Sequence, residues 1–191
     1  MKNKSGKLLM TIGLLLLAAA LVLTGYNIWD EHRAQGAVSA VMEHLPQPEP
    51  GETPANFLHG EMEMPTAEID GHRYIGRLSI PAIGLDLPVL SEWSSSNGKI
   101  APCRYRGSAY ANDFIIAGHN YRSHFGELKR VMVGDRVQFT DVNGNRFDYT
   151  VAAMEILEGT AVEEMEAGSW DLTLFTCTYG GQTRLTLRCV A

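Results

Sequence analysis

The first regular feature of the chain is an apolar run near its amino terminus. Residues 8–23 contain only Leu, Ile, Met, Val, Ala, Gly and Thr, and no charged side chain follows before Asp30. About 20 such residues cross a bilayer as a helix. We therefore expect a transmembrane helix, with residues 1–29 forming a short cytoplasmic stub and a signal anchor.

The residues that flank this run predict its orientation. Lys2, Lys4 and Lys7 precede the run, and Tyr26 and Trp29 close it. Because positive charge stays inside and aromatic side chains favour the interface, the amino terminus is expected in the cytoplasm and the rest of the chain outside the cell. A cleaved signal peptide is the alternative, since an alanine triplet lies in the run. The run continues past those alanines, which favours an uncleaved single-pass anchor.

Helical spacing continues after the apolar run. Ala34, Val38, Val41 and Leu45 recur at intervals of three or four residues, which predicts a short amphipathic helix. Four prolines follow within residues 46–54, a composition typical of an extended linker. Residues 30–72 are therefore expected to form a juxtamembrane helix and a spacer.

From about residue 73 the chain changes to short apolar runs broken by Gly, Pro, Asn and Asp. Seven runs have the length of a strand: 74–80, 85–90, 114–117, 136–140, 147–156, 172–177 and 184–190. This pattern predicts an all-β sandwich or barrel over residues 73–191, mostly with antiparallel neighbours. The acidic segment 158–168 is expected to be a long loop or a short helix.

Composition narrows the classes of function. The 191 residues suffice for one globular domain and an anchor. Sixteen Lys and Arg against 22 Asp and Glu give a net charge of -6. Since phosphate binding usually rests on a basic patch, this charge argues against nucleic acid as a partner. Three cysteines cannot all pair within an exported chain, so at least one thiol requires another explanation.

The carboxyl-terminal segment predicts a hairpin that carries one of these thiols. Two alternating strands flank Gly180 and Gly181, which can take the positive φ of a tight turn. If these glycines are the central turn residues, Cys177 lies directly opposite Arg184. Cross-strand neighbours have Cβ atoms about 4.5 to 5.5 Å apart and point to the same face, so the guanidinium is expected beside the thiol.

The rest of the hairpin supports this register. It gathers leucines on one face and leaves Phe175, Cys177 and Arg184 together on the other, and a slip by one residue would expose the leucines. Arg188 shares the second face but lies about 13 Å further along its strand. Arg184 is therefore the preferred partner, and a solvated strand face is the alternative for either arginine.

A nucleophilic thiol also requires a base. His119 follows the predicted strand 114–117 through Gly118, and catalytic groups are often displayed at strand ends and in their loops. His124, in the same loop, is an equal candidate from spacing alone. The other histidines lie in or near the juxtamembrane segment and linker and are expected to be solvated: His32, His44, His59 and His72.

Several separated motifs resemble the sortase family. Residues 173–177, Thr-Leu-Phe-Thr-Cys, resemble its TLxTC signature, and residues 117–120, Ala-Gly-His-Asn, resemble the segment that carries its histidine. Arg184 stands where the family arginine follows the cysteine on the next strand. Segments 74–84 and 133–137 also resemble sortase strands, and the motifs occur in the family's order from about residue 73 to the end.

The resemblance implies a closed eight-stranded sortase-type β-barrel with short helices, preceded by the membrane helix. It implies an enzyme, a cysteine transpeptidase that cleaves a C-terminal sorting motif similar to Leu-Pro-x-Thr-Gly through a thioacyl-enzyme and transfers the acyl group to an amine. The implied partners are surface proteins that carry the motif and an amine acceptor such as a peptidoglycan precursor. The implied location is the cell membrane, with the catalytic domain extracellular.

The resemblance also assigns roles to residues. Cys177 would be the nucleophile, His119 the general acid and base, and Arg184 the group that holds substrate or stabilises the oxyanion. Phe175, and less directly Thr176 and Ala117, would contact substrate. No cofactor or metal is expected: some sortases bind calcium through carboxylates in two loops, but the loop before residue 114 offers only Asp113.

Departures from the family pattern narrow the class. Residues 46–73 lack the Asp-Pro-aromatic lid of pilus-building sortases and no second apolar helix follows the last strand, which favours a protein-anchoring or specialised sortase. An L,D-transpeptidase and a non-enzymatic membrane-tethered β-domain are the alternatives. Cys189 is expected to be a buried structural thiol, and a disulfide between Cys103 and Cys189 is the less favoured possibility.

Overall fold

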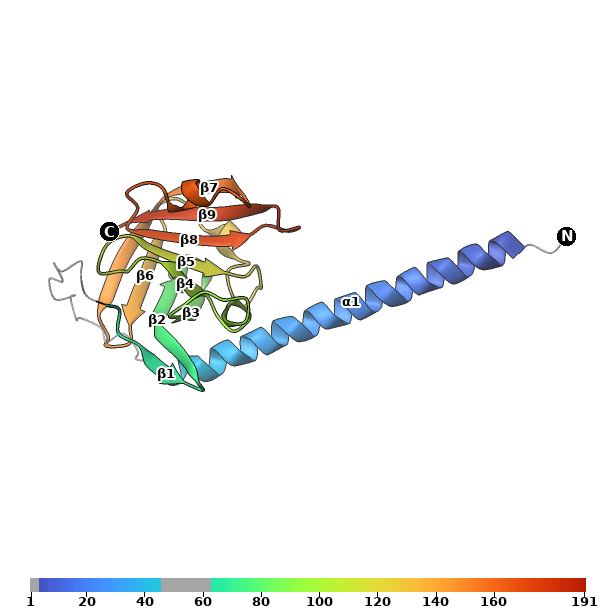
Figure 1. The fold of residues 1–191 in the computed structure, drawn as a ribbon, viewed down its shortest axis with the longest axis horizontal. Helices are drawn as coiled ribbons and strands as arrows, with labels where there is room; N and C mark the ends of the chain where they lie inside the picture. Colours follow the sequence, from blue (N-terminus) through green and yellow to red (C-terminus); the bar gives the residue numbers. More distant parts are fainter. Residues whose placement is uncertain (1–3, 46–62) are drawn as a thin grey trace. The chain divides into compact units, whose positions relative to one another are not determined.

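The computed structural model describes residues 4–45 and 63–191, and the chain divides into two compact units, Met1–Arg33 and Ala34–Ala191. Helix α1 (Lys4–Met42) is continuous through the predicted anchor and the predicted amphipathic segment (Figure 1). Within the described residues it is the one helix long and apolar enough to cross a membrane. The two units do not divide the chain at residues 29 and 72, where the sequence predicted domain boundaries. Those boundaries stay a prediction.

The second unit is built from nine strands in the part of the chain that the structure describes. Their order along the chain is β1 (Ala67–Ile69), β2 (His72–Ile80), β3 (Leu85–Leu90), β4 (Cys103–Arg106), β5 (Phe114–Gly118), β6 (Arg136–Asp141), β7 (Arg146–Glu158), β8 (Leu172–Cys177) and β9 (Thr183–Val190). Short helices join some of them: η1 (Pro81–Ile83), η2 (Asn97–Lys99), η3 (Leu128–Arg130) and α2 (Val162–Glu166).

Eight of these strands close into a barrel, as predicted. The sheet order is β1-β2-β3-β4-β5-β8-β9-β7-β6, and an additional pairing of β2 with β6 joins the two ends (Figure 1). β1 lies outside the ring and pairs with the beginning of β2. Closure leaves β5, β8 and β9 as neighbours, and these three strands carry the residues predicted to do chemistry.

The seven predicted runs all became strands, but the structure adds β1 and β4. β4 is short and reads Cys-Arg-Tyr-Arg, without the alternation that marks a half-buried strand. It pairs with β3 in parallel through one residue pair, Leu90 with Cys103, and β8 also runs parallel to β5. The remaining neighbours are antiparallel.

The barrel interior is filled by large apolar side chains from every side of the ring. The main cluster includes Leu78, Phe114, Phe139, Leu174 and Leu187, all fully buried. The residues of the first helix that belong to the second unit, and those that follow it, contribute as well, because Ala34, Val38, Val41 and Leu45 are buried within that unit. The predicted amphipathic face of residues 34–45 is therefore confirmed. The predicted proline-rich linker lies largely outside the described residues.

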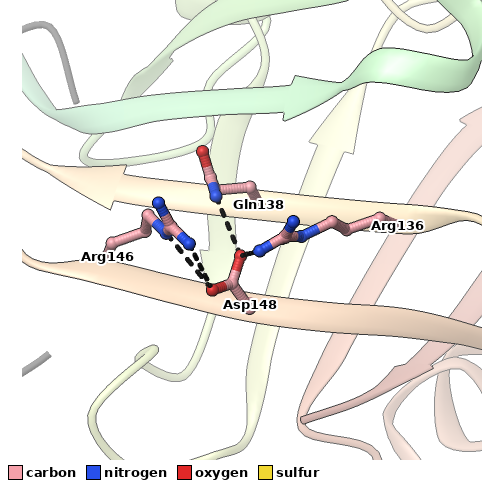
Figure 2. Close-up of polar contacts among 4 residues, drawn as sticks. All are labelled: Arg136, Gln138, Arg146 and Asp148. Atoms are coloured by element: carbon pink, nitrogen blue, oxygen red, sulfur yellow. Dashed lines mark hydrogen bonds and ion pairs between the residues drawn. The ribbon is translucent and has the colours of Figure 1, made fainter. Parts of the chain in front are cut away.

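The outer face of the β6–β7 hairpin carries a polar cluster around one carboxylate (Figure 2). Arg136 and Gln138 donate to Asp148 Oδ1 at 2.8 Å each, and Arg146 donates to Asp148 Oδ2 at 3.1 Å. Partial burial opposes ionisation, but the hydrogen bonds from Gln138, Arg136 and Arg146 outweigh it and hold the pKa of Asp148 below its usual range. The cluster fixes the register of this hairpin at its exposed face.

All three cysteines are free thiols. Cys103 packs with Tyr74, Leu90 and the end of α1, whereas Cys189 lies in the main barrel core. The proposed Cys103–Cys189 disulfide is therefore wrong, because the two thiols belong to different apolar clusters. Burial of both explains their presence without a bond.

Candidate active site

The β8–β9 hairpin brings Cys177 and Arg184 together in the register that the sequence predicted. Six consecutive pairs run from Leu172 opposite Cys189 to Cys177 opposite Arg184. Gly180 and Gly181 have φ values of 89° and 73°, the left-handed conformation that a side chain would disfavour. Cys177 and Arg184 thus form the last strand pair before the turn.

The contacts between these side chains place a cation and an aromatic ring at the thiol. Arg184 Nη1 lies 3.7 Å from Cys177 Sγ in hydrogen-bond geometry. The Arg184 guanidinium also lies over the ring of Phe175, 6.0 Å from its centroid. Tyr105 packs edge-on against the same ring at 5.3 Å. The thiol of Cys177 therefore has a charged hydrogen-bond donor beside it.

His119 is presented by a compact turn that begins where β5 ends. The turn closes when the Phe125 amide donates to the His119 carbonyl at 3.1 Å. Gly118 allows this, since a Cβ there would lie 2.5 Å from the Phe125 ring. The His119 ring is flanked by Trp93 and Tyr121, with centroids at 5.6 and 5.3 Å. Two aromatic rings therefore restrict the orientation of the imidazole.

The structure separates the two histidines that spacing could not distinguish. His124 is 1% exposed, and its Nε2 lies 3.1 Å from the Ile100 carbonyl. It does not line the pocket that holds Cys177. His119 does, so of these two histidines His119 is the one that shares a pocket with Cys177 and Arg184.

Cys177, His119 and Arg184 line one pocket of about 120 Å³ within the second unit. Phe175 and Ala117 also line it, whereas Thr176 does not. Thr176 is buried opposite Leu185, so its predicted contact with substrate stays a prediction. Gly118, between Ala117 and His119, also lines the pocket, and the remaining lining residues come from three other segments: Trp93, Tyr105, Gly159, Ala161, Val162 and Met165.

The pocket wall contributed by α2 and the preceding residues was missed in the sequence. Met165 is buried against Ala117 and Phe175, and Ala161 and Val162 lie beside it. Gly159 permits the chain to pass close to the hairpin, because a Cβ there would lie 2.7 Å from the Gln182 carbonyl. In the sequence, the apolar residues within the acidic segment 158–168 were the signal that could have indicated this wall.

The structure does not support the alternative that the sequence analysis gave for Arg188, a place on a solvated strand face. Arg188 is 2% exposed, so it is not part of a solvated strand face. It faces Thr173 rather than Cys177, in keeping with its predicted place further along the strand. Among residues 4–45 and 63–191 there is no group of three or more His, Cys, Asp or Glu side chains that could hold a metal ion.

A closed barrel that holds a thiol, a guanidinium and an imidazole in one pocket defines the class of cysteine acyltransferases. A family model described as a sortase domain matches residues 78–191. Sortase A of Bacillus anthracis is 24% identical over 179 residues, which cover 87% of this chain and 85% of the relative. The residues matched by the family model include the hairpin and the histidine turn.

Solved structures share the fold. Sortase C1 from Streptococcus agalactiae aligns with a TM-score of 0.55 and 26% identity, over 65% of this chain and 71% of that one. Sortase C from Clostridium perfringens SM101 aligns with a TM-score of 0.52 and 20% identity, over 61% and 68%.

The chain belongs to the sortase family. It is a sortase-type cysteine transpeptidase, a class that acts on proteins with a sorting motif and on amine nucleophiles. The L,D-transpeptidase and the non-enzymatic β-domain are therefore not supported. The relatives include sortases named A and C, so the expectation that this enzyme does not polymerise pilins stays a prediction.

Proposed function

We propose that Cys177 is the nucleophile, His119 the general acid and base, and Arg184 the group that stabilises the oxyanion. The observation that carries this proposal is the Cys177–Arg184 contact at 3.7 Å in a pocket that also contains His119. A guanidinium next to the attacking sulfur is placed to stabilise the negative charge that develops on the attacked carbonyl oxygen. Phe175 and Ala117 would contact the sorting motif through the apolar part of the same pocket.

The proposed reaction has two acyl-transfer steps. Cys177 Sγ attacks the carbonyl carbon of the threonine in an LPxTG-like motif, and its proton passes to His119. When the tetrahedral intermediate collapses, the C–N bond breaks and His119 protonates the leaving amine. An acceptor amine then attacks the thioester carbon, and the C–S bond breaks. The proton lost by that amine returns through His119 to the sulfur.

The acceptor is proposed to be a peptidoglycan precursor, so that the substrate protein becomes attached to the cell wall. Residues 1–29 would form the cytoplasmic stub and anchor, residues 30–72 the juxtamembrane helix and spacer, and residues 73–191 the catalytic domain. The apolar run in α1 and the three preceding lysines support a single-pass topology with the barrel outside.

An acyl-enzyme experiment tests the chemistry. The full chain in detergent is incubated with peptides that vary the LPxTG motif and with triglycine, and the protein mass is measured before and after the amine is added. We expect an acyl adduct on Cys177 that triglycine releases as a new peptide. A Cys189→Ala variant is the matched control and should still form the adduct. Folded protein that forms no adduct with any motif variant would refute the proposal.

Thiol labelling of intact cells tests the topology. A membrane-impermeant maleimide is expected to label Cys177 without lysis, because the pocket opens outside the cell. Cys177→Ala is the control for labelling at other thiols. Labelling that appears only after lysis would place the barrel in the cytoplasm and contradict the proposed orientation.

A further inference from the structure

Arg188 is a buried cation that the proposed reaction does not use. Its side chain is 3% exposed, and it points from β9 toward α2. Four acceptors surround the guanidinium. Nη1 donates to the Met165 carbonyl at 2.8 Å and to Thr173 Oγ1 at 3.2 Å, Nη2 donates to the Glu164 carbonyl at 2.6 Å, and Nε donates to Glu155 Oε2 at 3.2 Å.

The positions of these acceptors in the chain indicate which element Arg188 holds in place. A buried guanidinium is costly unless its donors are satisfied. Two of the four bonds go to carbonyls in the last turn of α2, where backbone oxygens lack partners within the helix and a cation is favourable. α2 has only five residues, too few to be stable alone. Arg188 therefore joins the end of a marginal helix to the rigid strand β9.

The helix held in this way forms part of the pocket wall. Met165, whose carbonyl accepts from Arg188, packs its side chain against Phe175 and Ala117. Thr186 Oγ1 also lies 3.7 Å from Met165 Sδ. Residues of β9 therefore contact both the backbone and the side chain of Met165. Displacement of Met165 would change the space between α2 and Phe175, where the apolar part of a bound peptide would lie.

Arg188 itself cannot take part in the chemistry. It is four residues from Arg184 on the same strand, about 13 Å along it, and it does not line the pocket. Glu155, its ionic partner on β7, is 40% exposed and lies opposite Thr186 of β9. Any effect of Arg188 on turnover must pass through the residues that it contacts, and of these Met165 lines the pocket.

We propose that Arg188 is a positioning residue that fixes α2 and thereby sets the shape of the substrate pocket. This inference rests on the proposed function, since it assigns substrate binding to the pocket between α2 and Phe175. It predicts that loss of the Arg188 contacts weakens peptide binding more than it slows bond breaking. The measurable signature is a rise in KM with kcat and the reactivity of Cys177 preserved.

The test compares Arg188→Lys and Arg188→Gln with the wild type, all as full chains in detergent. KM and kcat are measured with one sorting-motif peptide and triglycine, and the rate of Cys177 alkylation by iodoacetamide is measured without peptide. We expect KM to rise about tenfold in Arg188→Lys and more in Arg188→Gln, with kcat and the alkylation rate within about twofold of wild type. Amide hydrogen exchange should accelerate in residues 162–168 and not in β8.

Two matched variants separate this role from surface charge. Arg106→Gln removes the exposed ion pair between Arg106 and Glu166 of α2. Glu155→Gln removes the ionic partner of Arg188 but leaves the bonds from Arg188 to both carbonyls. Arg106→Gln is expected to change KM less than about twofold, since exposed ion pairs contribute little. Glu155→Gln is expected to change KM as little, because the amide oxygen of glutamine can still accept from Arg188 Nε. A large KM change in Arg106→Gln with none in Arg188→Lys would reverse the assignment.

The outcomes distinguish this inference from the proposed function. A wild type that forms no acyl adduct refutes the function. A wild type that turns over, with Arg188→Lys at unchanged KM and unchanged exchange in 162–168, refutes the positioning role, and so does a loss confined to kcat. If neither Arg188 variant folds, Thr186→Val decides: a KM raised about twofold to threefold supports the inference, and an unchanged KM overturns it.

Discussion

The two flanks of the pocket are held in different ways. Cys177 and Arg184 lie on a hairpin whose six cross-strand pairs fix both side chains through the backbone ladder. His119 lies on a turn, and its ring is flanked by Tyr121 of the same turn and by Trp93 from a distant segment. We call these the hairpin flank, residues 172–190, and the histidine flank, residues 93–100 and 118–125.

The difference has a physical cause. A hairpin is specified by its own alternation and turn residues, so the hairpin flank depends on contacts within about 20 residues of sequence. The histidine flank depends on contacts between segments more than 15 residues apart, such as His124 Nε2 with the Ile100 carbonyl. The hairpin flank should therefore resist perturbation outside its own strands, and the histidine flank should not.

The largest expected effect comes from the nucleophile on the hairpin flank. Cys177→Ala should lower kcat/KM by at least about a thousandfold, because no acyl-enzyme can form. Transfer of a sorting-motif peptide to triglycine is the measurement. Cys103→Ala is the control and should retain activity, since that thiol lies in a separate apolar cluster. Residual thioester chemistry in Cys177→Ala would mean that another residue is the nucleophile.

The partners on the two flanks are expected to fail in different ways. Arg184→Lys keeps the charge but loses the planar fork, and should lower kcat about a hundredfold with little change in melting temperature. His119→Gln should lower kcat by about a hundredfold to ten-thousandfold and abolish the limb of the pH–rate profile assigned to the imidazole. Stopped assays across pH 5–9 provide the comparison. A profile that His119→Gln leaves unchanged would remove His119 from proton transfer.

A single methyl group tests the side-chain packing of the histidine flank. In Gly98→Ala the added Cβ would lie 2.9 Å from the Trp93 ring and 3.2 Å from His119 Nε2, so both rings must move. We expect kcat to fall about tenfold, because a small displacement of a catalytic group is costly, while the iodoacetamide rate of Cys177 stays unchanged. Gly36→Ala, where a Cβ meets nothing within 4 Å, is the matched control. Equal kcat in both variants would show that the packing of this flank is not critical.

The smallest effect concerns the two buried thiols, one behind each flank. Cys103 packs beside Ala101 near the histidine flank, and Cys189 lies on β9. Burial raises the pKa of each thiol from 9.0 to about 12. Folding is therefore favoured by these thiols below pH 9, and that contribution is lost as the pH rises from 9 toward 12.

Two measurements follow for the buried thiols. The melting temperature should fall more steeply above pH 9 in the wild type than in a Cys103→Ala/Cys189→Ala variant. In mild urea, Cys103 should react with a maleimide before Cys189, since the less regular flank opens at lower free energy. The reverse order would contradict the distinction between the flanks.

The sequence was informative wherever the structure depends on local periodicity. The seven predicted runs, the Cys177–Arg184 pairing and the burial of residues 34–45 all follow from alternation, helical spacing and turn residues. β4 escaped detection because two arginines and a tyrosine interrupt its pattern, and it is fixed by pairing with Ile115, Ile116 and Ala117 of β5. Trp93 and Met165 were also missed, because each reaches the pocket only through packing between distant segments.

The histidine shows the limit most clearly. Spacing alone left His119 and His124 equal, and the family resemblance supplied the preference. In the structure, the burial of His124 against Ile100 distinguishes them, a contact that no pattern in residues 114–124 encodes. Contacts of this kind depend on how the barrel closes, which periodicity does not determine.

Closure of the barrel has a consequence for handling the second unit without the amino-terminal apolar run. Open sheet edges are templates for intermolecular pairing, and proteins protect them or avoid them. Here β2 pairs with both β3 and β6, so the ring offers no long edge, and the added strand β1 is three residues long with a glutamate at its centre. A fragment from residue 34 onward, freed of the exposed apolar run, should therefore stay monomeric at concentrations at which open-sheet proteins of this size aggregate.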